Sequence, residues 1–256
     1  MAKAAAYSAL LSFFPVLTTA AAVLVEFRAD SVSRFLLSLL FEAVPPGAEA
    51  LVRDHFAARG HRPVLVLVGA GLLSVWAASG VVSSLMQGFQ RAYGIARSRS
   101  ILHNFAVSMM LVLLAAVPLV AASVLILFGG HVDAVLSRWL AGDAAVGWAL
   151  VYRLSRYLVA IAATVCLTMV LYYFGPHRRQ RWRLVWRGAV VATGLWLAAT
   201  GAFGWYVRNL ANYNVVYGSV ATTVALLVWM FLMALVALVG CEFNALVERE
   251  LLQNPE

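Results

Sequence analysis

Residues 212–246 read NYNVVYGSVATTVALLVWMFLMALVALVGCEFNAL, and this stretch decides the class of fold. No residue between Asn209 and Cys241 carries a charge. The uncharged run is longer than the ~20 residues that a helix needs to cross about 30 Å of hydrocarbon, so it predicts a membrane span. Both ends of the run are polar, and lipid offers such groups no hydrogen-bond partner. The polar and aromatic residues at its start are Asn212, Tyr213, Asn214, Tyr217, Gly218 and Ser219, and those at its end are Glu242 and Asn244.

Composition indicates the same class without the help of any motif. Of the 256 residues, 63% are hydrophobic and only 12% are charged, whereas soluble domains are about 45–50% apolar. We therefore predict an all-α integral membrane protein, with residues 1–256 forming a single polytopic membrane domain. The net charge of +8 is interpreted as a basic cytoplasmic face that contacts anionic lipid, rather than as a surface for nucleic acid.

Six hydrophobic stretches are long enough to cross the membrane as helices. The predicted spans are residues 4–25, 64–86, 104–128, 147–174, 188–207 and 217–241. The first external connection, residues 26–62, has a pattern of its own. Polar and apolar side chains recur at three- and four-residue spacing over residues 31–44, which predicts an amphipathic helix. A second, more polar helix is predicted from Pro45 to about Arg59. Both helices either lie at the membrane–water boundary, which the pattern favours, or cover the outer mouth of the bundle.

The distribution of charge predicts the orientation of the chain. The loops at residues 91–99 and 178–187 contain arginines and no acid, whereas residues 26–62 balance their arginines with carboxylates. Because basic loops stay in the cytoplasm, both termini are predicted to be cytoplasmic. Trp182 and Trp186 lie between the arginines of the second loop. This pattern is more typical of an anchor at the lipid headgroups than of an RNA-binding strip.

Four motifs occur in order along the chain. They are AAAYSALLSFFP (residues 4–15), WAASG (76–80), YYFGPHRRQRWR (172–183), and the YGS turn with Trp229 and the Gly-x-Glu-x-Asn sequence at 240–244. Together they resemble the YihY/BrkB family of bacterial inner-membrane proteins. The resemblance implies a six-span helical protein of the bacterial inner membrane whose biochemical role is poorly defined. Members of that family usually carry a polar segment before the first span, so the start of this chain is interpreted as a truncated start site.

No group of residues predicts catalysis. The family has carried a ribonuclease label, but RNA hydrolysis needs a general acid and base, or carboxylates that hold metal ions. His103 and His177 fall in separate predicted loops, and Cys166 and Cys241 lie in apolar runs without a second ligand at metal-binding spacing. There is also no phosphate-binding loop and no dinucleotide fingerprint. We therefore predict that the chain is not an enzyme and binds no cofactor and no metal.

The candidate site residues are those that break a helix or carry groups that lipid cannot satisfy. Pro15 predicts a kink in the first span, used either for packing or as a hinge. Arg153 and Arg156 share one face near the start of the fourth span, where they either extend to the headgroups or attract an anion. The remaining candidates belong to the last span: Tyr213, Asn214, Tyr217, Gly218, Trp229, Glu242 and Asn244. They either hydrogen-bond to neighbouring helices or border a substrate path between the last span and the first.

The near absence of charge at mid-membrane depth argues against an ion-coupled carrier. The sequence favours transport or handling of a lipid-like or amphipathic molecule, with anionic molecules included. A structural or assembly role in the envelope is the alternative, and a ribonuclease-type enzyme comes third. The expected partners are membrane lipids and no nucleic acid, and association into homo-oligomers is left open.

Overall fold

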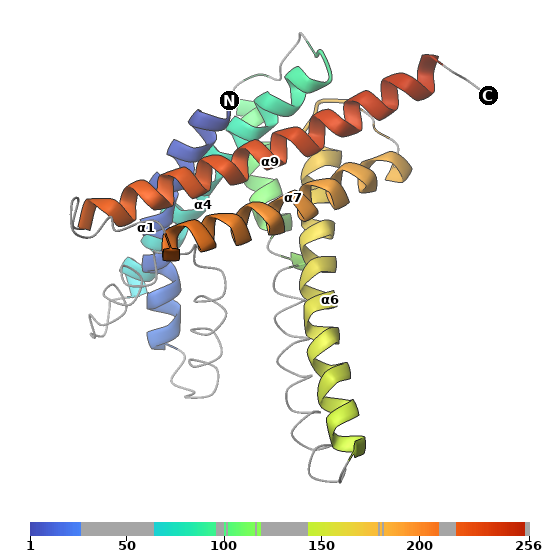
Figure 1. The fold of residues 1–256 in the computed structure, drawn as a ribbon. Coiled ribbons are helices and arrows are strands. Elements are labelled where there is room, and N and C mark those ends of the chain that lie inside the picture. Colours follow the sequence, from blue (N-terminus) through green and yellow to red (C-terminus); the bar gives the residue numbers. More distant parts are fainter. Residues whose placement is uncertain are drawn as a thin grey trace.

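The computed structural model describes residues 1–26, 64–95, 100, 102–115, 117–118, 143–178, 180, 182–209 and 219–253. Every regular element in these ranges is an α-helix (Figure 1). The helices are α1 (Ala2–Glu26), α4 (Val64–Ala92), α6 (Asp143–Phe174), α7 (Trp182–Asn209) and α9 (Ser219–Gln253), with a shorter helix over Leu102–Ala115. For the described part of the chain, the predicted all-α class is confirmed.

Several of these helices have the length and composition of membrane spans. Among the described residues, the segments that qualify are Gly71–Ala92, Leu154–Phe174, Trp182–Val207 and Thr222–Leu251, and Ala2–Leu17 and Leu102–Ala115 are shorter apolar segments. Their outward surfaces are apolar, since Leu72 is 67% exposed, Trp76 60% and Leu158 66%. An exposed apolar surface of this kind is suited to lipid rather than to water. The chain is an α-helical membrane protein.

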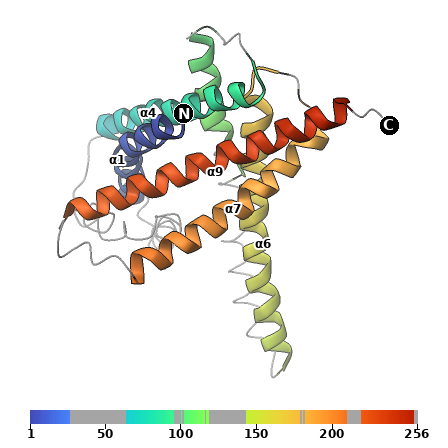
Figure 2. The ribbon, with the colours of Figure 1, turned by 45° about the horizontal axis from the view of Figure 1, so that its top comes forward.

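The longest of these helices, α9, organises the rest. It contacts α1, α4 and α7, while α6 contacts α7. Figures 1 and 2 show α9 lying across α1 and α4 and beside α7, with α6 running away from the place where α7 and α9 meet. The Leu102–Ala115 helix is attached to α4 by the Asn104 amide, which donates to the Ser83 hydroxyl at 2.8 Å.

Small side chains allow α1 and α4 to pack closely. Gly71 of α4 faces Thr19, and Gly80 faces Ser8. The hydroxyls of Thr19 and Ser74 form a hydrogen bond of 2.7 Å between the two helices. Small residues on one face let two helices approach closely. The glycines and serines of residues 64–86 predict such close packing, and these contacts agree with it.

Pro15 lies inside α1, where it removes one backbone donor. The carbonyl one turn earlier loses its helix donor, and the sequence offers the hydroxyls of Ser8, Ser12, Thr18 or Thr19 to compensate. The Thr19 hydroxyl donates to the Pro15 carbonyl at 3.0 Å, and the Ser12 hydroxyl donates to the Ala9 carbonyl at 2.9 Å. Neither of these two acceptors is the carbonyl that Pro15 deprives of its donor.

Helix ends differ from the predicted span ends, and three of the differences change where charged residues lie. The helices α4 and α9 continue beyond the spans predicted to end at residues 86 and 241, and α7 begins before residue 188. As a result, Arg91, Arg183 and Arg187 lie on helical turns rather than in loops. Glu242 and Asn244 lie inside α9 rather than at its exit. Long cationic side chains can reach the headgroups from a helical turn, so a charge at the bilayer boundary does not end a helix.

Other predictions lie outside the described residues. They are the two amphipathic helices over residues 31–44 and 45–59, the second part of the third span at residues 119–128, and the polar residues at 212–218.

Candidate functional site

The backbones of α7 and α9 come into contact at two glycines. A Cβ atom at Gly188 would collide with the carbonyl oxygen of Gly240. A Cβ atom at Gly240 would lie 2.9 Å from the Gly188 carbonyl and 2.6 Å from the Ala192 Cβ, closer than real Cβ atoms approach. Only glycine fits at both positions. This close contact explains why the Gly-x-Glu-x-Asn sequence begins with a glycine, Gly240.

Side-chain hydrogen bonds hold the same crossing together. Asn244 is 1% exposed; its Oδ1 accepts from the Gly188 N–H at 2.7 Å, and its Nδ2 donates to the Val185 carbonyl at 3.1 Å. The Tyr172 hydroxyl of α6 donates to the Ala237 carbonyl of α9 at 2.6 Å. Each such bond between membrane helices contributes about 0.6 to 2 kcal/mol. Helices α6, α7 and α9 are thus fixed against one another here.

A basic surface lies at one end of this crossing. We call it the basic end; it consists of the end of α4, residues 175–178, the start of α7 and the end of α9. Arg178 forms an ion pair with Glu248, with 3.0 Å between Nη2 and Oε1, and Arg249 donates to the Ala92 carbonyl at 2.8 Å. The Arg178 guanidinium also lies 6.0 Å from the centre of the Tyr93 ring. Burial raises the pKa of the Tyr93 hydroxyl above its usual value, so Tyr93 stays neutral.

Two histidines from segments that were predicted as separate loops lie close together beside the basic end. The ring centres of His103 and His177 are 6.4 Å apart, and both residues are exposed. Within the described ranges, no group of three or more His, Cys, Asp or Glu side chains could hold a metal ion. The pair therefore belongs to no larger metal-binding cluster in that part of the chain.

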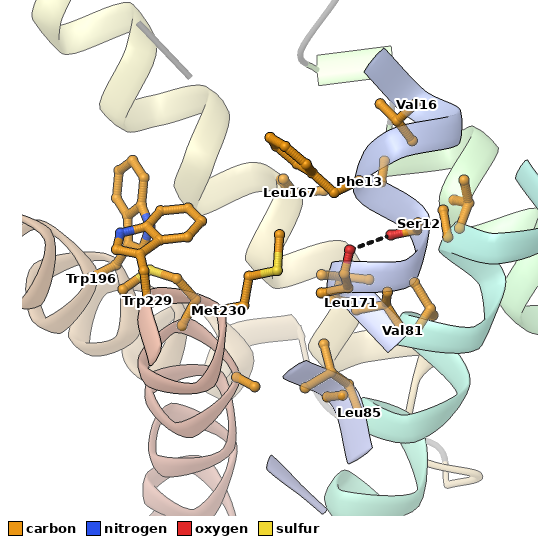
Figure 3. A pocket seen from close by; sticks show the side chains of 18 residues that line it. Ser12, Phe13, Val16, Val81, Leu85, Leu167, Leu171, Trp196, Trp229 and Met230 are labelled. Atoms are coloured by element: carbon orange, nitrogen blue, oxygen red, sulfur yellow. Dashed lines mark hydrogen bonds between the residues drawn. The ribbon is translucent and has the colours of Figure 1, made fainter. Parts of the chain in front are cut away.

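An open apolar pocket of about 520 Å³ lies between the helices (Figure 3). Side chains from α1, α4, the Leu102–Ala115 helix, α6, α7 and α9 line it. Figure 3 shows Trp196 and Trp229 on one side and Ser12 and Val81 on the other, with Met230 between them. The volume is within the about 300–1,000 Å³ typical of ligand sites.

Packed aromatic rings separate this pocket from the basic end. Leu85 and Leu171 line the pocket. One turn beyond Leu85 on α4 is Phe89, and directly after Leu171 on α6 is Tyr172. The two rings meet edge to face, with centres 5.3 Å apart, and each residue is 1% exposed. The pocket is therefore closed toward the basic end.

The candidate residues predicted from the sequence fall in different places. Trp229 lines the pocket, and Pro15 precedes the pocket residue Val16 in α1. Asn244 is buried in the α7–α9 crossing, whereas Glu242 and Arg156 are exposed on α9 and α6. The side chain of Arg153 and the residues Tyr213, Asn214, Tyr217 and Gly218 lie outside the described part. The buried amide thus lies about 15 Å along α9 from Ala234, the nearest pocket-lining residue of that helix, at about 1.5 Å per residue.

Three important residues were missed by reasoning from the sequence. Gly188 was only the expected first residue of a span, and Tyr172 was part of a quoted motif without a role. Arg249 was not considered. A single sequence gives no signal that pairs Gly188 with Gly240, because their contact depends on how two helices cross.

The comparison with known families decides the relationship. The family model described as virulence factor BrkB matches residues 1–256. The chain belongs to the virulence factor BrkB family. The resemblance inferred from four motifs is therefore confirmed.

Relatives of this BrkB-family chain carry mostly general names. A UPF0761 membrane protein of Alkalilimnicola ehrlichii is 31% identical over 240 residues, which cover 93% of this chain and 52% of that protein. The ribonuclease-like protein YfkH of Bacillus subtilis (strain 168) is 28% identical over 251 residues, which cover 95% of this chain and 88% of YfkH. The chain thus spans about half the length of the first relative. No solved structure matches the chain.

Proposed function

We propose that this BrkB-family protein transports or otherwise handles a lipid-like or amphipathic molecule within the bilayer. The observation that carries this proposal is the open apolar pocket between α1, α4, α6 and α9. None of the described side chains that line it is charged. An apolar body or acyl chain can enter such a pocket without penalty, whereas an ion would lose its hydration and gain no replacement.

The proposal includes an orientation in the membrane. The protein has six spans in the bacterial inner membrane, with both termini in the cytoplasm and interfacial helices in the first connection. Support comes from the membrane-length helices and from the arginines gathered at the basic end, since basic segments stay on the cytoplasmic side. In this orientation the pocket is closed toward the cytoplasm by Phe89 and Tyr172.

A structural role in the envelope without transport is the second candidate. It is favoured by the α7–α9 crossing, where the buried amide of Asn244 is used entirely for packing. A ribonuclease activity has weaker support. It rests on the name of YfkH, and the described residues offer His103 and His177 without a carboxylate cluster.

Filling the pocket tests the proposal. Ala78 and Ala115 line the pocket from α4 and from the Leu102–Ala115 helix. Ala78→Phe and Ala115→Leu each place a larger side chain in that space. Ala198→Phe is the matched control, because Ala198 is exposed on α7 outside the pocket lining.

Two measurements on purified protein are informative. In a chain whose six other tryptophans are replaced by phenylalanine, quenching of tryptophan fluorescence by lipids with brominated acyl chains reports occupancy beside Trp196 and Trp229. Dithionite bleaching of fluorescent phosphatidylglycerol in proteoliposomes reports movement across the bilayer. We expect the unaltered protein and Ala198→Phe to show both effects, and the two pocket variants to lose several-fold of each. Quenching that is equal in all four proteins, with no lipid movement, would leave only the structural role.

A further inference from the structure

Two exposed arginines at the start of α7 have no acidic partner among the residues that the structure describes. Arg183 and Arg187 are four residues apart, so they share a helix face and are separated by about 6 Å along the axis. Neither forms an ion pair with a carboxylate of the described residues, whereas Arg178 nearby is paired with Glu248. Two adjacent positive charges that no described carboxylate neutralises attract an anion.

The first turn of α7 strengthens this attraction. Its backbone N–H groups have no acceptor within the helix, and the helix dipole adds a partial positive charge at the same end. A phosphate group is the kind of anion that such an arrangement binds, because its oxygens accept from both backbone N–H and guanidinium groups.

Two tryptophans stand beside the arginines. Trp182 and Trp186 are 46% and 48% exposed and share a neighbouring face of α7. The Trp182 ring stacks on the Tyr173 ring, with centres 4.2 Å apart and an angle of 22° between the planes. This contact fixes one indole against the end of α6. Indole rings prefer the depth of lipid headgroups, next to the hydrocarbon.

We infer that the start of α7 binds the phosphate headgroup of one anionic phospholipid. Arg183, Arg187 and the first helical turn hold the phosphate, and Trp182 and Trp186 lie against the glycerol region. Depth favours this ligand, because the membrane-length segment of α7 begins at Trp182, so Arg183 lies at its end and the long side chain of Arg187 can extend back to the same headgroup level. RNA also offers phosphates, but Tyr173 already covers one face of the Trp182 indole on which a base would stack. This site is separate from the apolar pocket. It binds the charged phosphate group, which the uncharged lining of the pocket disfavours.

Lipid retention measured by native mass spectrometry tests this site. The purified protein is equilibrated with equal amounts of phosphatidylglycerol and phosphatidylcholine and then stripped by detergent. The test variant is Arg183→Gln with Arg187→Gln. The control is Lys3→Gln with Arg91→Gln, which removes the same charge from two exposed residues of α1 and α4. We expect the test variant to retain on the order of tenfold less phosphatidylglycerol than the control, because each cation near an anionic surface contributes appreciably to binding.

Further variants distinguish this site from its alternatives. Arg183→Lys with Arg187→Lys should restore most of the retention, and Ala78→Phe should leave it unchanged, since the pocket is a different place. Equal losses in the test and control variants would show a general charge effect and overturn the site. Loss of phosphatidylglycerol in Ala78→Phe would assign the lipid to the pocket instead. If the test variant keeps its lipid but no longer binds a single-stranded RNA oligonucleotide that the unaltered protein binds, the surface recognises RNA and our inference is wrong.

Discussion

Replacing Gly188 by alanine should force α7 and α9 apart. The new Cβ atom would collide with the Gly240 carbonyl oxygen and with the Asn244 amide. The first of these is a backbone atom, so the collision cannot be relieved by rotating a side chain. The crossing can accept the methyl group only if the two helices separate.

The cost of this change has two parts. Overpacking of a well-packed site costs about 1–3 kcal/mol. Separation of the helices also lengthens the hydrogen bond from the Gly188 N–H to Asn244, which is worth about 0.6–2 kcal/mol. We therefore expect Gly188→Ala to lower the free energy of unfolding by about 2–5 kcal/mol.

The matched control is Gly194→Ala in the same helix. A Cβ atom at Gly194 meets no atom within 4 Å, and the residue is exposed. Since alanine forms helices better than glycine, this variant should be unchanged or more stable by up to about 1 kcal/mol. Both are measured by unfolding in mixed dodecylmaltoside and dodecylsulfate micelles, followed by tryptophan fluorescence. Equal midpoints for the two variants would refute the close contact at Gly188.

Two other predictions concern the buried amide and the orientation of the chain. Asn244→Ala should lower the free energy of unfolding by about 1–4 kcal/mol, because it removes two hydrogen bonds between helices. Glu242→Ala, exposed on the same helix, should leave the midpoint unchanged, and similar losses in both variants would contradict the role given to the amide. In a chain whose native cysteines are replaced by alanine, a cysteine at exposed Ser100 should react with a membrane-impermeant maleimide only from the cytoplasmic side, and labelling on intact cells would reverse the proposed orientation.

Hydropathy located the membrane helices because a helix that crosses the bilayer needs about 20 consecutive residues that are mostly apolar. The same criterion failed at the helix ends. A charged residue reads as a loop signal by this criterion, which therefore ends the last span near Cys241 and begins the fifth span at Gly188, although α9 and α7 extend beyond these residues. At the bilayer boundary, arginine and tryptophan are compatible with a helical turn, and Arg183 and Arg187 show this directly.

The candidate site could be predicted only in part. Gly240 and Asn244 stood out as a motif, but their function depends on Gly188 and Val185, more than fifty residues earlier in the chain. Which helices cross, and at what point, is a property of the folded bundle. The pocket left no trace in the sequence, because its apolar lining has the same composition as a surface that faces lipid.

The two halves of α9 contact their neighbours in different ways, and this difference restricts where the helices could separate to let a ligand pass. Its second half is held to α7 by Gly240 and Asn244 and to the end of α4 by Arg249. Its first half lines the pocket with Trp229 and Met230, and its described contacts with α1 are between apolar side chains. A weak hydrogen bond of 3.9 Å, from the Thr200 hydroxyl to the Met233 sulfur, also connects this half to α7. Movement that opens the pocket therefore costs least between α1 and the first half of α9, not at the α7–α9 crossing. It follows that a lost activity in an Asn244 variant would reflect damage to the fixed half, whereas changes among the pocket residues would act on the ligand binding that we propose.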